Sequence, residues 1–386
     1  MQITQEPISE RVERGRQAIL LLHFGFFLSG LATALPGALI PIFTRQWLLS
    51  DAYAGTLVAM QFLTSAMGAV LVAHRRVKTV RLGYLLAGAG FMLLSLDSRA
   101  MASAAFAAIG GGIGLAMTST SLLISEVYPT RRGGALSLLN FSWGVGAMLA
   151  PALVRVLSVH GAIRSMFLTL AVLFALSLVL SMRLLHGMQG NASRRVQSAS
   201  DTSLRAYFAM MLFLYVGIES SIGNWVTEFA ERSSVGHHAW IAPYVASLFW
   251  GALLMGRALA PVVLRATSEF VLHVSASAAA VVAVVSLRLA GSYSGIAAAA
   301  IVAGFALAPV FPLGVSAVVS RSNGRSRLGW VFAFAGFGGA VFTWLEGQLS
   351  TSLHSLRSSF TLSAIGAMAM LLMTAVYPWV WRRPRK

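Results

Sequence analysis

Twelve apolar runs, each long enough to cross a bilayer, are the feature that most limits how this chain can fold. A transmembrane helix needs about 20 apolar residues. The runs lie near residues 18–43, 53–73, 80–97, 101–125, 134–157, 162–185, 204–230, 240–264, 270–289, 293–319, 328–351 and 357–381. Only 11% of the 386 residues are charged, too few to cover the surface of a soluble protein of this length. We therefore expect an all-α membrane protein and exclude soluble enzymes, disordered chains and fibrous proteins.

The distribution of basic residues predicts the orientation of the chain. If the N-terminus is cytosolic, about three quarters of the Lys and Arg residues lie on the cytosolic side, as the positive-inside rule requires. This placement makes residues 1–17 a cytosolic tail and residues 382–386 a basic cytosolic tail. It also accounts for the net charge of +17 without a nucleic-acid partner. The expected partner is the lipid bilayer.

The two halves of the chain show weak internal similarity. The longest polar connection, residues 186–203, follows the sixth run and is predicted to be a cytosolic linker between bundles at 18–185 and 204–381. The fifth run reads FSWGVGAMLAPAL and the eleventh FAGFGGAVFTWLEG, with Gly146 opposite Gly339. Duplicated halves are typical of secondary transporters. The alternative is that glycine is simply common in membrane helices.

Several segments carry a more specific resemblance. Residues 125–153, SEVYPTRRGGALSLLNFSWGVGAMLAPAL, are similar to the fourth-to-fifth helix region of the major facilitator superfamily of transporters. FFLSGLATALPGALIPIF (26–43), LSDAYAGTLVAMQFL (49–63) and YVGIESSIGNWVTEF (215–229) resemble its fucose–galactose–glucose permease family. The resemblance implies twelve transmembrane helices in two pseudo-symmetric six-helix bundles, alternating access, a sugar as the small-molecule substrate, and a bacterial plasma (inner) membrane.

The resemblance does not extend to the proton-binding carboxylates of that family. Its first-helix carboxylate, just before an Ile-Pro pair, corresponds here to Gly37, and its fourth-helix carboxylate corresponds to Met117. Neither side chain binds a proton. Two possibilities remain open: a uniporter, which we favour, or proton coupling that has moved to Glu219.

Two carboxylates lie inside the apolar runs, where an ionisable group is costly and is a functional candidate by default. Glu219 lies near the centre of the seventh run, and Glu346 lies in the outer part of the eleventh. Glu219 is either a substrate or proton site or a structural carboxylate bonded to a neighbouring helix. Glu346 is a gate or substrate contact, a partner of an outer Arg, or a solvated group. Both are candidates for ion coupling.

Amide and aromatic side chains complete the predicted site, because sugars offer hydroxyls to amides and CH faces to aromatic rings. The substrate-binding candidates are Gln61, Asn140, Trp143, Glu219, Asn224, Trp225, Trp250, Phe337 and Trp344. We expect the three amides to face a central cavity, because an unpaired amide in lipid is costly. Arg257 is expected to be a cytosolic-side anchor or a clamp between the halves.

The sequence predicts a transporter and not an enzyme. It contains no Cys, and its Gly110–Gly114 stretch lacks the Lys-Ser/Thr of a phosphate-binding loop. We expect no cofactor, no metal site and a monomer. Two alternatives remain: an exporter of apolar drugs or lipids on the same fold, and a non-transporting membrane sensor.

Overall fold

The computed structural model describes the chain outside residues 1–7, 73–74, 187–201, 234–241, 322–328 and 381–386. Nearly all of the described residues are helical. The predicted linker 186–203 and the tail 382–386 fall largely or wholly outside the described residues, as does the start of the tail 1–17. The boundaries given to these segments therefore stay predictions.

The first half of the chain forms six long helices. They are α1 (Ile8–Gln46), α2 (Asp51–Val70), α3 (Arg76–Leu94), α4 (Arg99–Val127), α5 (Arg132–Val159) and α6 (Ile163–Leu184). The described residues of the second half form one 3-10 turn and eight helical segments. They are α7 (Thr202–Ser233), η1 (Ala242–Tyr244), α8 (Val245–Val263), α9 (Glu269–Leu289), α10 (Tyr293–Leu307), α11 (Val310–Arg321), α12 (Gly329–Ser352), α13 (Leu356–Ser359) and α14 (Thr361–Val380).

The helices agree with the twelve predicted runs. Eleven segments of the described chain are long and apolar enough to cross a membrane. The tenth run is divided into α10 and α11 at Pro309, which has no N–H to continue the helix. The remaining run is α12, whose 24 residues extend about 36 Å although Glu346 and several Gly lower its mean hydropathy. The protein is thus an all-α, multi-pass membrane protein.

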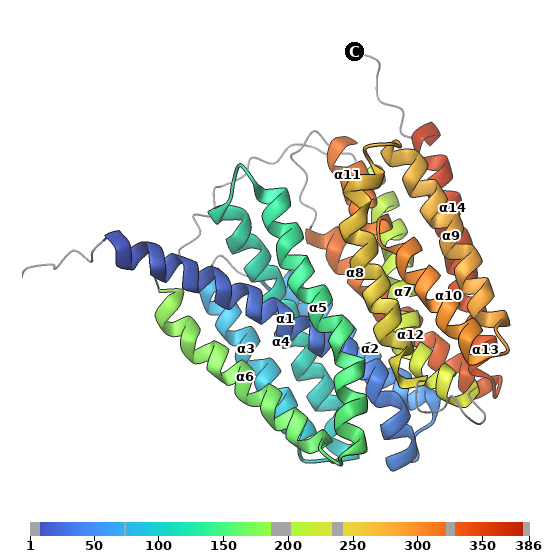
Figure 1. Ribbon diagram of the computed structural model, residues 1–386, viewed down its shortest axis with the longest axis horizontal. Helices are drawn as coiled ribbons and strands as arrows, with labels where there is room; N and C mark the ends of the chain where they lie inside the picture. The colour runs from blue at the N-terminus through green and yellow to red at the C-terminus, as the bar shows by residue number, and fades with distance from the viewer. Residues whose placement is uncertain (1–7, 73–74, 187–201, 234–241, 322–328, 381–386) are drawn as a thin grey trace, which may run out of the picture.

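The packing of the helices repeats between the halves. In the first half α1 packs on α5, α2 on α4, and α3 on α6; in the second, α7 packs on α12, α8 on α10, and α9 on α14. Figure 1 shows α3–α6 on the left and α7–α14 on the right, with α2 beside α12. Across the boundary, α2 lies along α12, α5 along α8, and α1 along α7. Two related bundles therefore meet through pairs of long helices.

Glycine allows the closest of these helix contacts. A Cβ atom at Gly146 of α5 would lie 2.1 Å from the carbonyl oxygen of Phe27 in α1. In the second half, a Cβ atom at Gly338 of α12 would lie 2.1 Å from the carbonyl oxygen of Phe213 in α7. The counterpart of Gly146 is thus Gly338, one residue from the predicted Gly339. Small residues at such crossings let helix backbones approach in a membrane, where lipid gives them no hydrophobic reason to associate.

Candidate functional site

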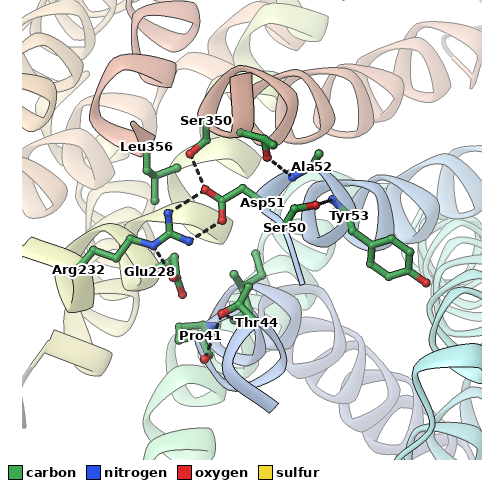
Figure 2. Close-up of polar contacts among 12 residues, drawn as sticks. Pro41, Thr44, Ser50, Asp51, Ala52, Tyr53, Glu228, Arg232, Ser350 and Leu356 are labelled. Atoms are coloured by element: carbon green, nitrogen blue, oxygen red, sulfur yellow. Dashed lines mark hydrogen bonds and ion pairs between the residues drawn. The ribbon is translucent and has the colours of Figure 1, made fainter. Parts of the chain in front are cut away.

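An ionic cluster joins the two halves at one end of the molecule, which we call the outer end after the orientation predicted from the basic residues. Ser50 caps α2 by accepting from the Tyr53 N–H, and this places Asp51 in the first helical turn. Arg232 of α7 donates to Asp51 Oδ1 at 2.5 Å and Oδ2 at 2.8 Å (Figure 2). The guanidinium therefore forms a bidentate ion pair with the first residue of α2, which is the stronger geometry for an arginine–carboxylate pair.

Two further side chains complete this outer cluster, defined as Asp51, Glu228, Arg232 and Ser350. The Nε of Arg232 donates to Glu228 Oε1 at 2.6 Å, one turn earlier on α7. The Ser350 hydroxyl of α12 donates to Asp51 Oδ2 at 2.5 Å (Figure 2). Both carboxylates are buried. The cluster thus joins α2 of the first half to α7 and α12 of the second.

A second, more exposed ion pair lies at the same end. Arg45 near the end of α1 donates to Glu231 of α7 at 2.6 Å. The backbone N–H of Ala52 also donates to the Thr351 hydroxyl at 2.8 Å. The outer end is therefore closed by polar contacts from α1 and α2 to α7 and α12.

A partly buried ion pair lies where α5, α7 and α8 meet. Arg257 Nη2 donates to Glu219 Oε1 at 3.1 Å and to the Tyr215 hydroxyl at 3.1 Å. The same guanidinium lies 5.7 Å from the ring centroid of Trp143, which belongs to the other half. Glu219 is thus bonded to a neighbouring helix, one of the two roles expected for it. Arg257 contacts both halves, as expected of a clamp.

Trp143, which lies over the Arg257 guanidinium, contacts a second tryptophan that has an unpaired polar atom. The rings of Trp143 and Trp250 meet edge to face with centroids 5.6 Å apart. Trp143 Nε1 donates to Thr33 Oγ1 at 3.4 Å, but the buried Trp250 Nε1 has no acceptor among the described residues. Trp250 packs on α7 at Gly223, whose Cβ would lie 2.4 Å from Trp250 Cζ2. The tryptophans therefore link α5 and α8 to the middle of α7.

The residue after Gly223 supplies an unpaired acceptor. Asn224 is buried, and its Nδ2 donates to the Ser220 carbonyl at 2.7 Å. Its Oδ1 has no donor among the described residues. We call Trp143, Glu219, Asn224, Trp250 and Arg257 the central cluster. Of the nine predicted substrate-binding residues, Trp143, Glu219 and Trp250 are joined in it by direct contacts, and Asn224 lies next to Gly223, on which Trp250 packs.

The remaining candidates lie elsewhere in this state. Gln61 is buried and donates to the Ala32 carbonyl of α1 at 2.9 Å, and Trp225 is buried and donates to the Thr343 carbonyl of α12 at 3.2 Å. Each therefore ties two helices together. Asn140 is exposed and donates to the Leu136 carbonyl of its own helix at 2.8 Å. Phe337 and Trp344 are also exposed.

Glu346 has surroundings that the sequence does not indicate. It is fully buried among α7, α12 and α14, where it accepts from the Ser221 and Ser363 hydroxyls, the latter at 2.6 Å. The expectation of an outer Arg partner or of a solvated position is therefore wrong. Its side chain points into the second half because α7 and α14 pack on that face of α12.

The outer cluster is the part of the site that the sequence pattern does not single out. Asp51, Glu228 and Arg232 lie at the ends of apolar runs, where charged residues are ordinary. The only sequence feature that could have indicated this cluster is the presence of acidic residues at the outer ends of the second and seventh runs. No group of three His, Asp or Glu side chains able to hold a metal ion is found in the described part of the chain.

Comparisons with known proteins agree with this architecture. The model of the Major Facilitator Superfamily matches residues 22–327. Two solved structures of POT family transporters are similar in fold. The structure in complex with 5-aminolevulinic acid has a TM-score of 0.78 and 14% sequence identity, and the match covers 95% of this chain and 97% of that chain. The structure in complex with a thioalcohol conjugated peptide has a TM-score of 0.77 and 14% sequence identity, and the match covers 95% of this chain and 97% of that chain. A sequence search of curated proteins finds no match. The chain belongs to the major facilitator superfamily, whose members are transporters and not enzymes.

Proposed function

We propose that this protein is a secondary transporter that moves a sugar by alternating access, with residues 18–185 and 204–381 as its two rocking halves. The observation that carries the proposal is the central cluster. A buried indole N–H and a buried amide oxygen, Trp250 Nε1 and Asn224 Oδ1, have no partners among the described residues. A buried polar group without a partner is costly. A sugar hydroxyl both donates and accepts, so it can satisfy either atom.

The aromatic and charged members of the central cluster support the same solute. The rings of Trp143 and Trp250 suit the CH face of a sugar, and Glu219 and Arg257 suit its hydroxyls. An apolar drug or lipid could form no hydrogen bond with Glu219 or Arg257, so these side chains favour a polar solute. The resemblance of residues 26–43, 49–63 and 215–229 to sugar permeases points in the same direction.

The outer cluster supports alternating access. In this state it joins α2 to α7 and α12, so a solute can leave toward the outside only after Arg232 releases Asp51. Side chains at the opposite end of α5, including Asn140, are exposed. We take this to be the state in which the outer path is closed, and a rocking motion of the halves exchanges it for the outward-open state.

A small zwitterion is the second candidate for the solute. The pair of Glu219 and Arg257 presents one charge of each sign, 3.1 Å apart, which could exchange partners with an ammonium and a carboxylate. One of the structures with this fold holds 5-aminolevulinic acid, although 14% identity carries only the fold. Zwitterions therefore belong in the same binding screen.

The membrane location and orientation form part of the proposal. We place the monomer in a bacterial plasma membrane with both termini and the linker 186–203 in the cytosol, because that placement follows the positive-inside rule. The native chain has no Cys, so a single Ser198→Cys variant gives a clean test, although Ser198 lies outside the described residues. Labelling of this Cys by an impermeant reagent in intact cells would show that the linker lies outside the cell, and would contradict the predicted orientation.

The solute can be tested by thermal unfolding of the purified protein in detergent with a panel of hexoses, 6-deoxyhexoses, amino acids and short peptides. A sugar should raise the unfolding temperature of the native protein, and Trp250→Phe, which keeps the ring and removes the N–H, should weaken that shift. Leu248→Ala on an exposed face of α8 is the matched control. A shift by zwitterions alone would support the second candidate, and shifts by apolar compounds alone would reject both.

A further inference from the structure

We propose that Glu346 is a proton-binding site that couples closure of the outer end to proton concentration. In this proposal the carboxyl is protonated while the outer end is closed and releases its proton when that end opens. The inference rests on the alternating-access function proposed above and names the ion that drives it.

Glu346 differs from the other buried acidic residues in its partners. The buried carboxylates of the described chain are Asp51, Glu219, Glu228 and Glu346, with 8%, 7%, 6% and 0% of their surface exposed. The first three form ion pairs with Arg232 or Arg257. Glu346 forms no ion pair with any cationic side chain that the structure describes. The most deeply buried acid is therefore the one without a counterion.

The partners of Glu346 fit a carboxylic acid as well as a carboxylate. Ser221 of α7 donates to Oε2, and Ser363 of α14 donates to Oε1 at 2.6 Å. A hydroxyl can also accept, so one serine can rotate to receive the O–H of the protonated acid. An ionised carboxylate buried without a counterion costs several kcal/mol, and such groups neutralise instead. The neutral acid is therefore the form that suits this closed, dry position.

The position of Glu346 on α12 connects it to the outer cluster. Ser350, which donates to Asp51, lies one turn further along the same helix face. A Cβ atom at Gly347 would lie 2.5 Å from the carbonyl oxygen of Asp51, so α12 and α2 are in close backbone contact here. From Glu346 to the end of α12 at Ser352 is about 9 Å of helix.

Separation of α2 from α12 would bring water within two helical turns of Glu346. Water stabilises the ionised carboxylate, so the open state would bind the proton less tightly than the closed state. By linkage, the state that binds the proton more tightly gains population as the pH falls. Acid should therefore close the outer end, and alkali should open it.

Other ionisable groups on the elements packed against α12 must be separated from this effect. They are Asp51 and Tyr53 on α2, Arg205, Tyr207, Tyr215, Glu219, Glu228, Glu231 and Arg232 on α7, Arg357 on α13, and Tyr377 on α14. Asp51 and Glu228 belong to the outer cluster and can themselves respond to pH. A pH response of the outer end is therefore evidence for Glu346 only if it changes when Glu346 alone is replaced.

The first experiment measures closure without any substrate. Spin labels on Leu96→Cys and Leu289→Cys, exposed positions at the outer ends of the first and second halves, report the distance between the halves by pulsed electron paramagnetic resonance. In the parent pair the outer-open population should grow from acidic to alkaline buffer. Glu346→Gln, a mimic of the neutral acid, should stay closed throughout. Glu269→Gln is the matched control, because Glu269 also accepts from a serine on a neighbouring helix, Ser316, but is exposed.

Two further variants keep the test decisive if Glu346→Gln fails to fold. Glu346→Asp retains the carboxylate and should retain a pH response. Ser363→Ala removes a donor to the ionised form, so the midpoint of opening should move up by about one pH unit. An unchanged midpoint in Ser363→Ala, or a parent-like pH response in Glu346→Gln, would overturn the proposal.

Infrared difference spectra between acidic and alkaline buffer provide an independent measurement. The carbonyl band of a protonated carboxylic acid should disappear on alkalinisation in the parent protein, and this change should be absent from Glu346→Gln. The same difference band in both proteins would assign the proton to another group. Neither measurement uses a solute, so failure of the sugar screen would leave this test intact, and a negative result here would leave the solute proposal standing.

Discussion

Loss of the Arg232 guanidinium should open the outer end of the transporter. Arg232→Gln leaves Asp51 and Glu228, with 8% and 6% of their surface exposed, without a cationic partner. Removing one partner of a fully buried pair costs about 3–5 kcal/mol, and of a surface pair about 0–1 kcal/mol. The Arg232 side chain is 42% exposed, so we expect an intermediate cost of about 2 kcal/mol.

The part of this cost that comes from Asp51 falls on the outer-closed state alone, because opening separates Asp51 from Arg232, whereas Glu228 stays beside Arg232 on α7 in both states. A change of about 2 kcal/mol alters the ratio of closed to open molecules by about 30-fold, which is the upper limit of the effect. The distance distribution between labels on Leu96→Cys and Leu289→Cys measures that ratio. Opening should be readily detected in Arg232→Gln even where the parent protein is almost entirely closed.

The neighbouring ion pair supplies the control. Arg45 is 66% exposed and its partner Glu231 is 19% exposed, so Arg45→Gln should cost less than about 1 kcal/mol. It should therefore change the closed-to-open ratio by no more than a few-fold. Equal opening in the two variants, or none in Arg232→Gln, would refute the reasoning that burial of the two carboxylates makes this cluster the main outer contact.

Three further outcomes follow from the structure. Trp250→Phe should lower the affinity for the solute about 5- to 10-fold by removing one hydrogen bond, with little change in unfolding temperature, as measured by calorimetry and thermal unfolding. Glu219→Gln should destabilise the fold by about 1–3 kcal/mol because it leaves the partly buried Arg257 without a carboxylate, and Glu219→Gln with Arg257→Met should recover part of the loss in the same denaturation assay. Gly37→Ala should disfavour the outer-closed state by about 1–3 kcal/mol through overlap with α7, which the label distances would report.

Much of the fold could be predicted because a bilayer restricts backbone structure so strongly. A run of apolar residues in lipid must be helical, so run lengths indicate the helices. The division of the tenth run follows from a local residue, Pro309, whereas the one-residue change from Gly339 to Gly338 depends on helix packing, which composition does not encode.

The members of the candidate site could be predicted only where the type of residue requires a particular environment, as a charged side chain inside a membrane requires a partner. Glu219 is paired with Arg257 of the neighbouring helix, and Trp143 meets Trp250 of the opposite half, because buried charged and aromatic side chains need partners. Gln61 has the same chemistry as the buried amide of the central cluster but bonds a backbone carbonyl of α1. Which of two amides ties helices together and which keeps a free oxygen is decided by register between helices, a property of the assembled bundle.

The surroundings of Gly37 show where a proton-binding carboxylate cannot lie in this protein. The resembling permeases have a carboxylate at this position, but here a Cβ atom would lie 2.5 Å from the Gly223 carbonyl oxygen and 2.6 Å from Asn224 Cα. The α1–α7 crossing is therefore a backbone contact that no acidic side chain could share in this state. That contact also positions Asn224, whose free Oδ1 belongs to the central cluster. The proton site that we propose therefore has to lie away from the crossing, on a helix that moves with the outer end. Glu346 on α12 meets both conditions, since it is buried within the second half and lies one turn from the serine that holds Asp51.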